Sequence, residues 1–148
     1  MAPLYQSIGG IFMISLSNTT AQTIDAGQSL TFNTVLLKTR SRAECFRKNT
    51  GSIKLCASCA IYEVSFSGNI SGATAGTPIQ LALALGGDVL PETTMVATPS
   101  AANAASNVSV TTLVNNNCCD YDRVTITNTG TTAVTVAANP IFFVKRVA

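Results

Sequence analysis

Apolar residues alternate with polar or small ones in short runs along most of the chain, and this period of two is typical of β-strands. The clearest run, residues 78–85, places four aliphatic side chains on one face. A second run, residues 52–67, contains Tyr62, Val64 and Phe66 in the same alternation. Val, Ile and Thr are abundant, and their branched Cβ atoms favour strands over helices. The pattern therefore predicts an all-β chain.

The remaining strands are predicted from the same alternation and from the Gly and Asn residues that punctuate it. They are expected at residues 11–17, 29–38, 89–97, 107–114, 123–127, 133–137 and 141–147. Two turn sequences, Gly86-Gly87-Asp88 and Asn128-Thr129-Gly130-Thr131, predict hairpins. Only residues 100–106 could form a helix, and an Ala-rich loop fits that stretch at least as well.

Short strands at regular spacing, without helices between them, indicate a sandwich or barrel. The length of 148 residues suits one domain with one core. No internal repeat and no linker divides the chain. We expect residues 1–10 to form an N-terminal arm or tail and residues 11–148 to form the folded domain.

The surface that this composition predicts is polar but poorly charged. Only 11% of the residues are charged, against the usual quarter. Ser, Thr and Asn together supply 44 of the 148 residues. Such a surface loses its water easily, which favours close packing against neighbouring molecules, although a Thr-rich β protein with an ordinary surface has the same composition.

The residues do not favour an enzyme. The chain has no histidine, so it lacks the commonest general base and metal ligand. The closest acidic pair, Asp120 and Asp122, is a candidate for cation binding beside Asn115, Asn116 and Asn117, although an ordinary polar turn has the same composition. No phosphate-binding loop or dinucleotide motif is present, and no cofactor is expected.

Five cysteines leave several alternatives open. They are Cys45, Cys56, Cys59, Cys118 and Cys119. The CxxC spacing of the second and third lacks the second knuckle of a zinc site. Buried thiols and disulfides both remain as interpretations, and an odd number leaves one thiol free or paired between subunits.

The nine basic residues are unevenly distributed, and six of them lie between positions 38 and 54. This stretch is either a solvated loop or a contact with a partner, for which we single out Arg40, Arg42, Arg47 and Lys48. The net charge of +2 is too small to indicate a nucleic-acid partner. No apolar run is long enough for a membrane helix, so membrane insertion is not expected.

The order of these strands resembles a known family. The phrases at residues 11–15, 28–33, 51–55, 60–66, 122–126 and 140–144 are similar to those of the jelly roll shared by complement globular heads and tumour-necrosis-factor-like proteins. The likeness covers nearly the whole chain, although Ala60 stands where that family has Gly. The alternating Leu and Ala of residues 81–87, with residues 90–94 and 124–130, look most like short bacterial and bacteriophage members.

The resemblance implies a single jelly-roll β-sandwich that assembles as a homotrimer with apolar contacts around a threefold axis. For that interface we single out Tyr62, Phe66, Phe142 and Phe143. It further implies a structural virion protein, of the capsid-decoration or head-fibre type, that docks to the major capsid protein or another structural protein. The alternatives are a subunit or cap of a spore or cell-surface appendage, disulfide cross-linked through Cys118 or Cys119, and a glycan- or protein-binding module.

Overall fold

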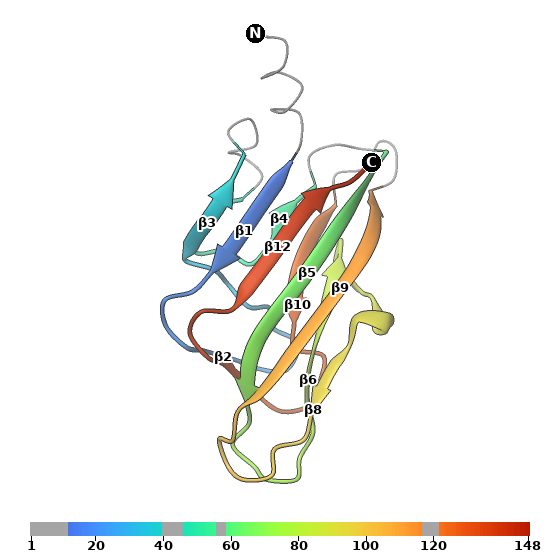
Figure 1. Ribbon diagram of the computed structural model, residues 1–148. Coiled ribbons are helices and arrows are strands. Elements are labelled where there is room, and N and C mark those ends of the chain that lie inside the picture. The colour runs from blue at the N-terminus through green and yellow to red at the C-terminus, as the bar shows by residue number, and fades with distance from the viewer. Residues whose placement is uncertain (1–11, 40–45, 56–58, 117–121) are drawn as a thin grey trace, which may run out of the picture.

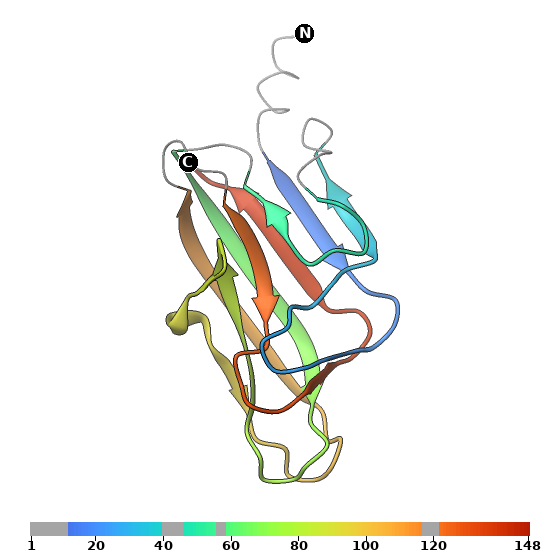
Figure 2. The same ribbon diagram turned by 180° about the vertical axis from the view of Figure 1, so that it is seen from behind.

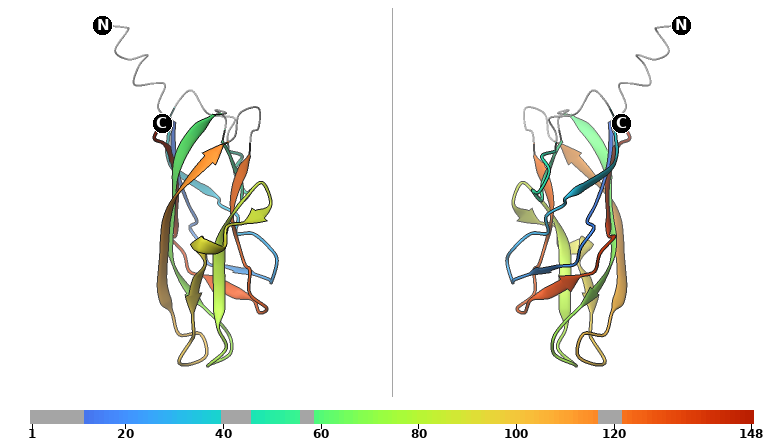
Figure 3. Two further views of the ribbon diagram at one scale, coloured as in Figure 1. Left: turned by 90° about the vertical axis from the view of Figure 1, so that its right-hand side faces the viewer. Right: turned by 90° about the vertical axis from the view of Figure 1, so that its left-hand side faces the viewer.

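The protein is a sandwich of two antiparallel sheets, as the two side views make plain (Figures 1 and 3). The computed structural model describes residues 12–39, 46–55, 59–116 and 122–148. Within these residues the chain forms strands joined by loops and one short 3-10 helix, η2 (Pro91–Thr93). The predicted all-β jelly-roll sandwich is confirmed.

The larger sheet has seven strands, with β5 (Ala60–Ser71) at its centre. One edge of β5 pairs along its whole length with β9 (Ser106–Asn116). Its other edge pairs with two strands in succession, β12 and β11. The sheet continues from these with β12 (Ile141–Arg146), β1 (Met13–Ser17) and β3 (Thr34–Lys38), and separately with β11 (Val134–Val136) and β2 (Gln22–Ile24).

The smaller sheet covers the other side of the core, and its strands are seen best from behind (Figure 2). Its five strands are β4 (Ile53–Lys54), β10 (Arg123–Thr127), β6 (Ile79–Leu85), β7 (Asp88–Val89) and β8 (Met95–Ala97). β6 pairs with β10 on one side and with β7 and β8 on the other.

The core is built from the inward side of this alternation. Leu81 and Leu83 of β6 and Val64 of β5 are fully buried between the sheets. Phe32 and Phe142 stack there with ring centroids 5.2 Å apart. Burying such side chains is the main favourable term in folding, at about 1.5–3 kcal/mol for each large one.

The two hairpin predictions had opposite outcomes. Gly86 and Gly87 form the two-residue turn between β6 and β7, both at positive φ, as a tight hairpin requires. The Asn128 segment does not close a hairpin, because β10 belongs to the smaller sheet and β11 to the larger one. Asn128 is instead fully buried at the crossing between the sheets, and its Nδ2 donates to Ile24 O at 3.0 Å and Thr132 O at 2.8 Å.

Two further expectations were adjusted by the structure. The predicted strand at residues 29–38 is divided: Ser29 bridges Thr127 of the smaller sheet, whereas β3 pairs with β1 of the larger one. Residues 100–105 form turns, so the loop interpretation of the Ala-rich stretch is correct.

Candidate functional site

The outer side of the seven-stranded sheet carries large apolar side chains that the fold leaves in solvent. We call this the apolar face and define it by Leu113 of β9, Ile61 of β5, Ile141 and Phe143 of β12, and Met13 of β1. Leu113 is 64% exposed, Ile141 45% and Ile61 38%, whereas Phe143 and Met13 are half-buried. Hydroxyl side chains fill the positions between them.

One ion pair lies within this face. Lys145 Nζ is 3.6 Å from Glu63 Oε1, and the two side chains are 38% and 35% exposed. In the strand register Glu63 lies between Lys145 and Leu113, so the pair is flanked by apolar neighbours. The face therefore carries two opposite charges that cancel, and its other side chains are apolar, hydroxyl or amide groups, among them Asn115 beside Ile61.

Three of the four residues predicted for the subunit interface are wrong. Tyr62, Phe66 and Phe142 are at most 1% exposed in the single chain, because they lie on the inward side of β5 and β12. Tyr62 packs edge-on against Phe12, with ring centroids 5.8 Å apart. Only Phe143, which points away from Phe142 along β12, reaches the outer side.

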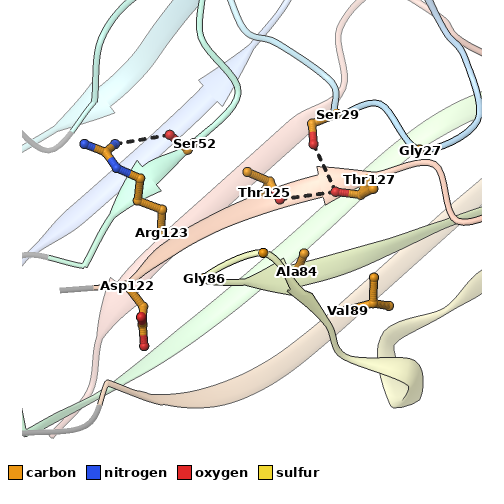
Figure 4. Close-up of a pocket in the computed structure, with 11 residues that line it drawn as sticks. Gly27, Ser29, Ser52, Ala84, Gly86, Val89, Asp122, Arg123, Thr125 and Thr127 are labelled. Atoms are coloured by element: carbon orange, nitrogen blue, oxygen red, sulfur yellow. Dashed lines mark hydrogen bonds between the residues drawn. The ribbon is translucent and has the colours of Figure 1, made fainter. Parts of the chain in front are cut away.

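The outer side of the smaller sheet is hollowed into a polar trough with a volume of about 570 Å³ (Figure 4). Its floor is the outer side of β10, where Thr125 and Thr127 alternate with the buried Val124 and Ile126. The hairpin residues Gly86, Gly87 and Val89 flank one side, with Ala84 beside the floor. The other lining residues are Gly27, Ser29, Ser52, Asp122 and Arg123.

The trough is open because small residues surround it. In the register Ala84 lies opposite Thr125, so no large side chain rises from β6 at that point. A Cβ atom at Gly86 would lie 3.1 Å from Asp122 Oδ1, so the glycine lets the hairpin approach this carboxylate. The Gly86 amide also donates to Arg123 O at 2.8 Å, which anchors the hairpin to β10.

Hydroxyl groups line the trough in a connected series. Thr127 Oγ1 lies 3.0 Å from Ser29 Oγ and 3.2 Å from Thr125 Oγ1. At one end Arg123 Nη1 donates to Ser52 Oγ at 3.1 Å (Figure 4). Asp122 and Arg123 point to opposite sides of β10 at this end, so a carboxylate and a guanidinium are both available.

A smaller cavity of about 260 Å³ lies next to the trough. It shares Ser52 and Arg123 with the trough and adds Phe46, Arg47 and Thr50. Arg47, which the sequence singled out for a partner contact, therefore lies in the cavity next to the trough and shares that cavity with Arg123. Lys48 is also exposed, whereas Arg40 and Arg42 lie outside the described residues.

The other predicted site residues are only partly covered by the structure. Asp122 lines the trough, and its proposed cation-binding neighbour Asp120 lies outside the described residues. Among the residues that the structure describes, no three His, Cys, Asp or Glu side chains cluster as metal ligands would. Cys59 is exposed and disulfide-bonded. Cys45, Cys56, Cys118 and Cys119, for which buried thiols or disulfides were predicted, lie outside the described residues.

The sequence reasoning missed the trough, although one signal was available. The period-2 pattern of residues 123–127 places Arg123, Thr125 and Thr127 on one polar face, and the register of the structure puts Ala84 and Ala82 opposite the two threonines. Polar residues facing small ones predict a depression once the strand pairing is known. The pairing of β10 with β6 was not available from the pattern. In the described ranges, no helix has the length and apolarity needed to cross a bilayer.

Comparison with known proteins places the fold. No family model matches the chain, and no curated protein matches it at a significant level. Among solved structures, the globular domain of zebrafish complement 1qA superposes with a TM-score of 0.63 at 15% identity, covering 89% of this chain and 94% of that one. Murine APRIL gives a TM-score of 0.67 at 9% identity, covering 93% and 99%.

A third solved structure with a similar fold is an insect protein. Eiger TNF from S. frugiperda gives a TM-score of 0.64 at 9% identity, covering 93% of this chain and 92% of that one. Identities this low establish architecture alone. These neighbours, together with the two antiparallel sheets, show that the chain has the jelly-roll fold of complement globular heads and tumour-necrosis-factor-like proteins.

Proposed function

We propose that this chain is a non-enzymatic structural protein that assembles as a homotrimer through its apolar face and docks onto a larger particle, the exterior of a virion. The apolar face is the observation that carries the proposal. A single chain leaves Leu113, Ile141 and Ile61 in water on one side of one sheet. Exposed apolar side chains that share one side of a sheet favour packing against another protein.

The composition of the face suits burial against copies of itself. Interface cores are depleted in charged residues and enriched in aromatic residues and Met. Phe143 and Met13 supply these, and the one ion pair, Lys145–Glu63, is already neutral as a unit. Hydroxyl and amide side chains occupy the remaining positions and cost less to desolvate than charges.

The threefold arrangement rests on the sequence resemblance, in which such jelly rolls meet around a threefold axis. The virion assignment rests on the likeness to short bacteriophage members and on the low charge of the chain. Arg47 and Lys48, both exposed, lie away from the apolar face and offer a contact to the major capsid protein.

Substitution on the apolar face tests assembly. We expect Leu113→Lys to convert a trimer to a monomer in sedimentation velocity at micromolar concentration, because a buried charge without a partner is costly. Val96→Lys is the matched control, since Val96 is 56% exposed on β8 of the other sheet. A wild-type chain that sediments as a monomer would overturn the trimer.

The virion assignment has its own test. Density-gradient fractions of the source culture are searched for this chain by peptide mass spectrometry. Co-banding with DNA-filled particles supports the proposal, and its copy number relative to the major capsid protein separates decoration from a fibre. Banding with spores or cell envelopes alone contradicts it.

The second candidate is an appendage subunit on a spore or cell surface, and the disulfide at Cys59 is compatible with such an oxidising location. This residue is exposed, and disulfides persist in oxidising surroundings. A ladder of covalent oligomers that collapses on reduction would support this candidate. A single band at the mass of one chain, with and without reductant, argues against it.

A further inference from the structure

We propose that the polar trough binds an acidic saccharide, with the sugar hydroxyls along its floor and the sugar carboxylate at Arg123. This activity is separate from assembly, because the trough lies on the smaller sheet and the apolar face on the larger one. Its volume of about 570 Å³ lies within the range of about 300–1,000 Å³ that is typical of small-ligand sites.

The floor matches the chemistry of a sugar. Ser29, Thr127 and Thr125 form a chain of hydroxyls at 3.0 and 3.2 Å. Each hydroxyl can donate one hydrogen bond and accept others, and a sugar hydroxyl has the same dual capacity. Ala84 and Val89 add a small apolar area beside them, where the C–H groups of a pyranose ring can pack.

The charged end of the trough provides the selectivity. Arg123 is exposed and donates one bond to Ser52 Oγ, which leaves most of its five N–H donors for a ligand. Within the described part of the chain no carboxylate forms an ion pair with it. A guanidinium without a counterion favours a planar carboxylate, which it binds through two parallel hydrogen bonds.

Asp122, on the opposite side of β10, restricts the ligand class further (Figure 4). Its carboxylate accepts hydrogen bonds from sugar hydroxyls but repels a dense polyanion such as a polyphosphate or nucleic acid. A neutral sugar would satisfy Asp122 and leave the charge of Arg123 unused.

The smaller cavity next to the trough offers space for a further unit of a longer saccharide. Arg47 and Thr50 lie there beside the shared Ser52, so a second acidic sugar unit would again meet a guanidinium and hydroxyls. The trough and this cavity together therefore progress from a hydroxylated floor to a cationic end.

Two acidic probes and their neutral counterparts test the proposal by isothermal titration calorimetry. The probes are hyaluronan tetrasaccharide, with its carboxyl-reduced form, and sialyllactose, with lactose. We expect at least one acidic sugar to bind at least tenfold more tightly than its neutral counterpart, because a charge-assisted pair is lost on reduction.

Three variants locate the binding. Arg123→Gln should lower the affinity for the acidic probe at least tenfold. Lys38→Gln, which removes a positive charge from β3 of the other sheet, should leave that affinity unchanged. Thr125→Tyr should abolish binding by filling the trough. Tyrosine favours strands, so the fold should tolerate this outward-facing substitution. Circular dichroism of the variant checks that it is folded.

Four results would overturn the proposal. They are the absence of binding to both acidic sugars, equal binding of acidic and neutral forms, equal affinity for polyglutamate, and binding that survives both Arg123→Gln and Thr125→Tyr in folded protein. The sedimentation experiment on Leu113 is independent of these, so failure of the trough and failure of assembly are separately visible.

Discussion

On the outer side of β5 and β12 the side chains that face solvent include Ile61, Ile141 and Phe143, whereas on the outer side of β10 they are Arg123, Thr125 and Thr127. Both sets alternate with buried residues of the same core. The fold therefore provides two equivalent outward surfaces, and the residue types at the outward positions decide their chemistry.

The difference extends to shape. The apolar face carries large side chains on adjacent strands, so it presents bulk to a neighbour. On the smaller sheet, alanine and glycine beside β10 remove bulk and leave a trough. An exposed apolar surface favours a protein partner, and a polar depression favours a small hydrated ligand.

The adjacent residues Phe142 and Phe143 offer the largest test of this division. Phe142→Ala should lower the free energy of unfolding by about 3–5 kcal/mol, because it removes a fully buried ring from its stack with Phe32. Phe143→Ala should cost less, and its cost should grow with protein concentration because the proposed trimer buries this side chain. Urea unfolding at two concentrations measures both, and equal, concentration-independent losses would refute the division.

Asn128 lies at the crossing between the two sheets, so its removal should destabilise the packing of both. Asn128→Ala leaves Ile24 O, Thr132 O and Gly130 N without their buried partner, and we expect a loss of about 2–3 kcal/mol. Asn107→Ala is the control, since its Nδ2 bond to Asn69 is exposed and should contribute under about 0.5 kcal/mol. Thermal unfolding compares them, and similar melting temperatures for the two variants would contradict the expectation.

The hairpin beside the trough gives a smaller effect. Gly86→Ala and Gly87→Ala should each cost about 1–2 kcal/mol, because both positions have positive φ. Only the first also crowds Asp122, so only Gly86→Ala should perturb the amide resonance of Asp122 beyond the hairpin. Chemical denaturation and amide chemical shifts read out the two effects. If Gly87→Ala leaves the free energy of unfolding unchanged, the turn backbone must adjust to accept a side chain there, and the expectation is wrong.

The ion pair of the apolar face gives the smallest effect in a single chain. Glu63→Gln should change monomer stability by less than about 0.5 kcal/mol, because partly exposed pairs contribute little. In the trimer the same change leaves Lys145 buried without its partner and should weaken association at least tenfold. Sedimentation equilibrium measures this ratio, and an unchanged association constant would remove Glu63 from the interface.

The strands and the fold class were predictable because alternation is a local property. Residues 123–127 were predicted with the bounds that β10 has, and the Gly86-Gly87 turn was read correctly. The crossing at Asn128 was not predicted, because a turn sequence does not show whether the next strand stays in the same sheet. β2 was missed because three residues are too short for a period to emerge.

The candidate sites were harder, since they depend on which face of a strand is inward. Tyr62 and Phe66 lie on the same face, but the alternation alone cannot distinguish core from interface when both are apolar. The trough requires β4, β6 and β10 to be neighbours, and their separation along the chain hides this. Pairing, rather than propensity, is the information that a single sequence lacks.

The position of β12 between β1 and β5 has a consequence for synthesis. β12 leaves the ribosome after every other described strand, yet both of its neighbours need it. Until it emerges, the facing edges of β1 and β5 have unpaired amides and carbonyls, which is a state prone to aggregation. Because Ile141 and Phe143 lie on this strand, a nascent chain completes its sheet and its proposed assembly surface in the same step. Under that proposal, prematurely terminated chains would be excluded from the oligomer.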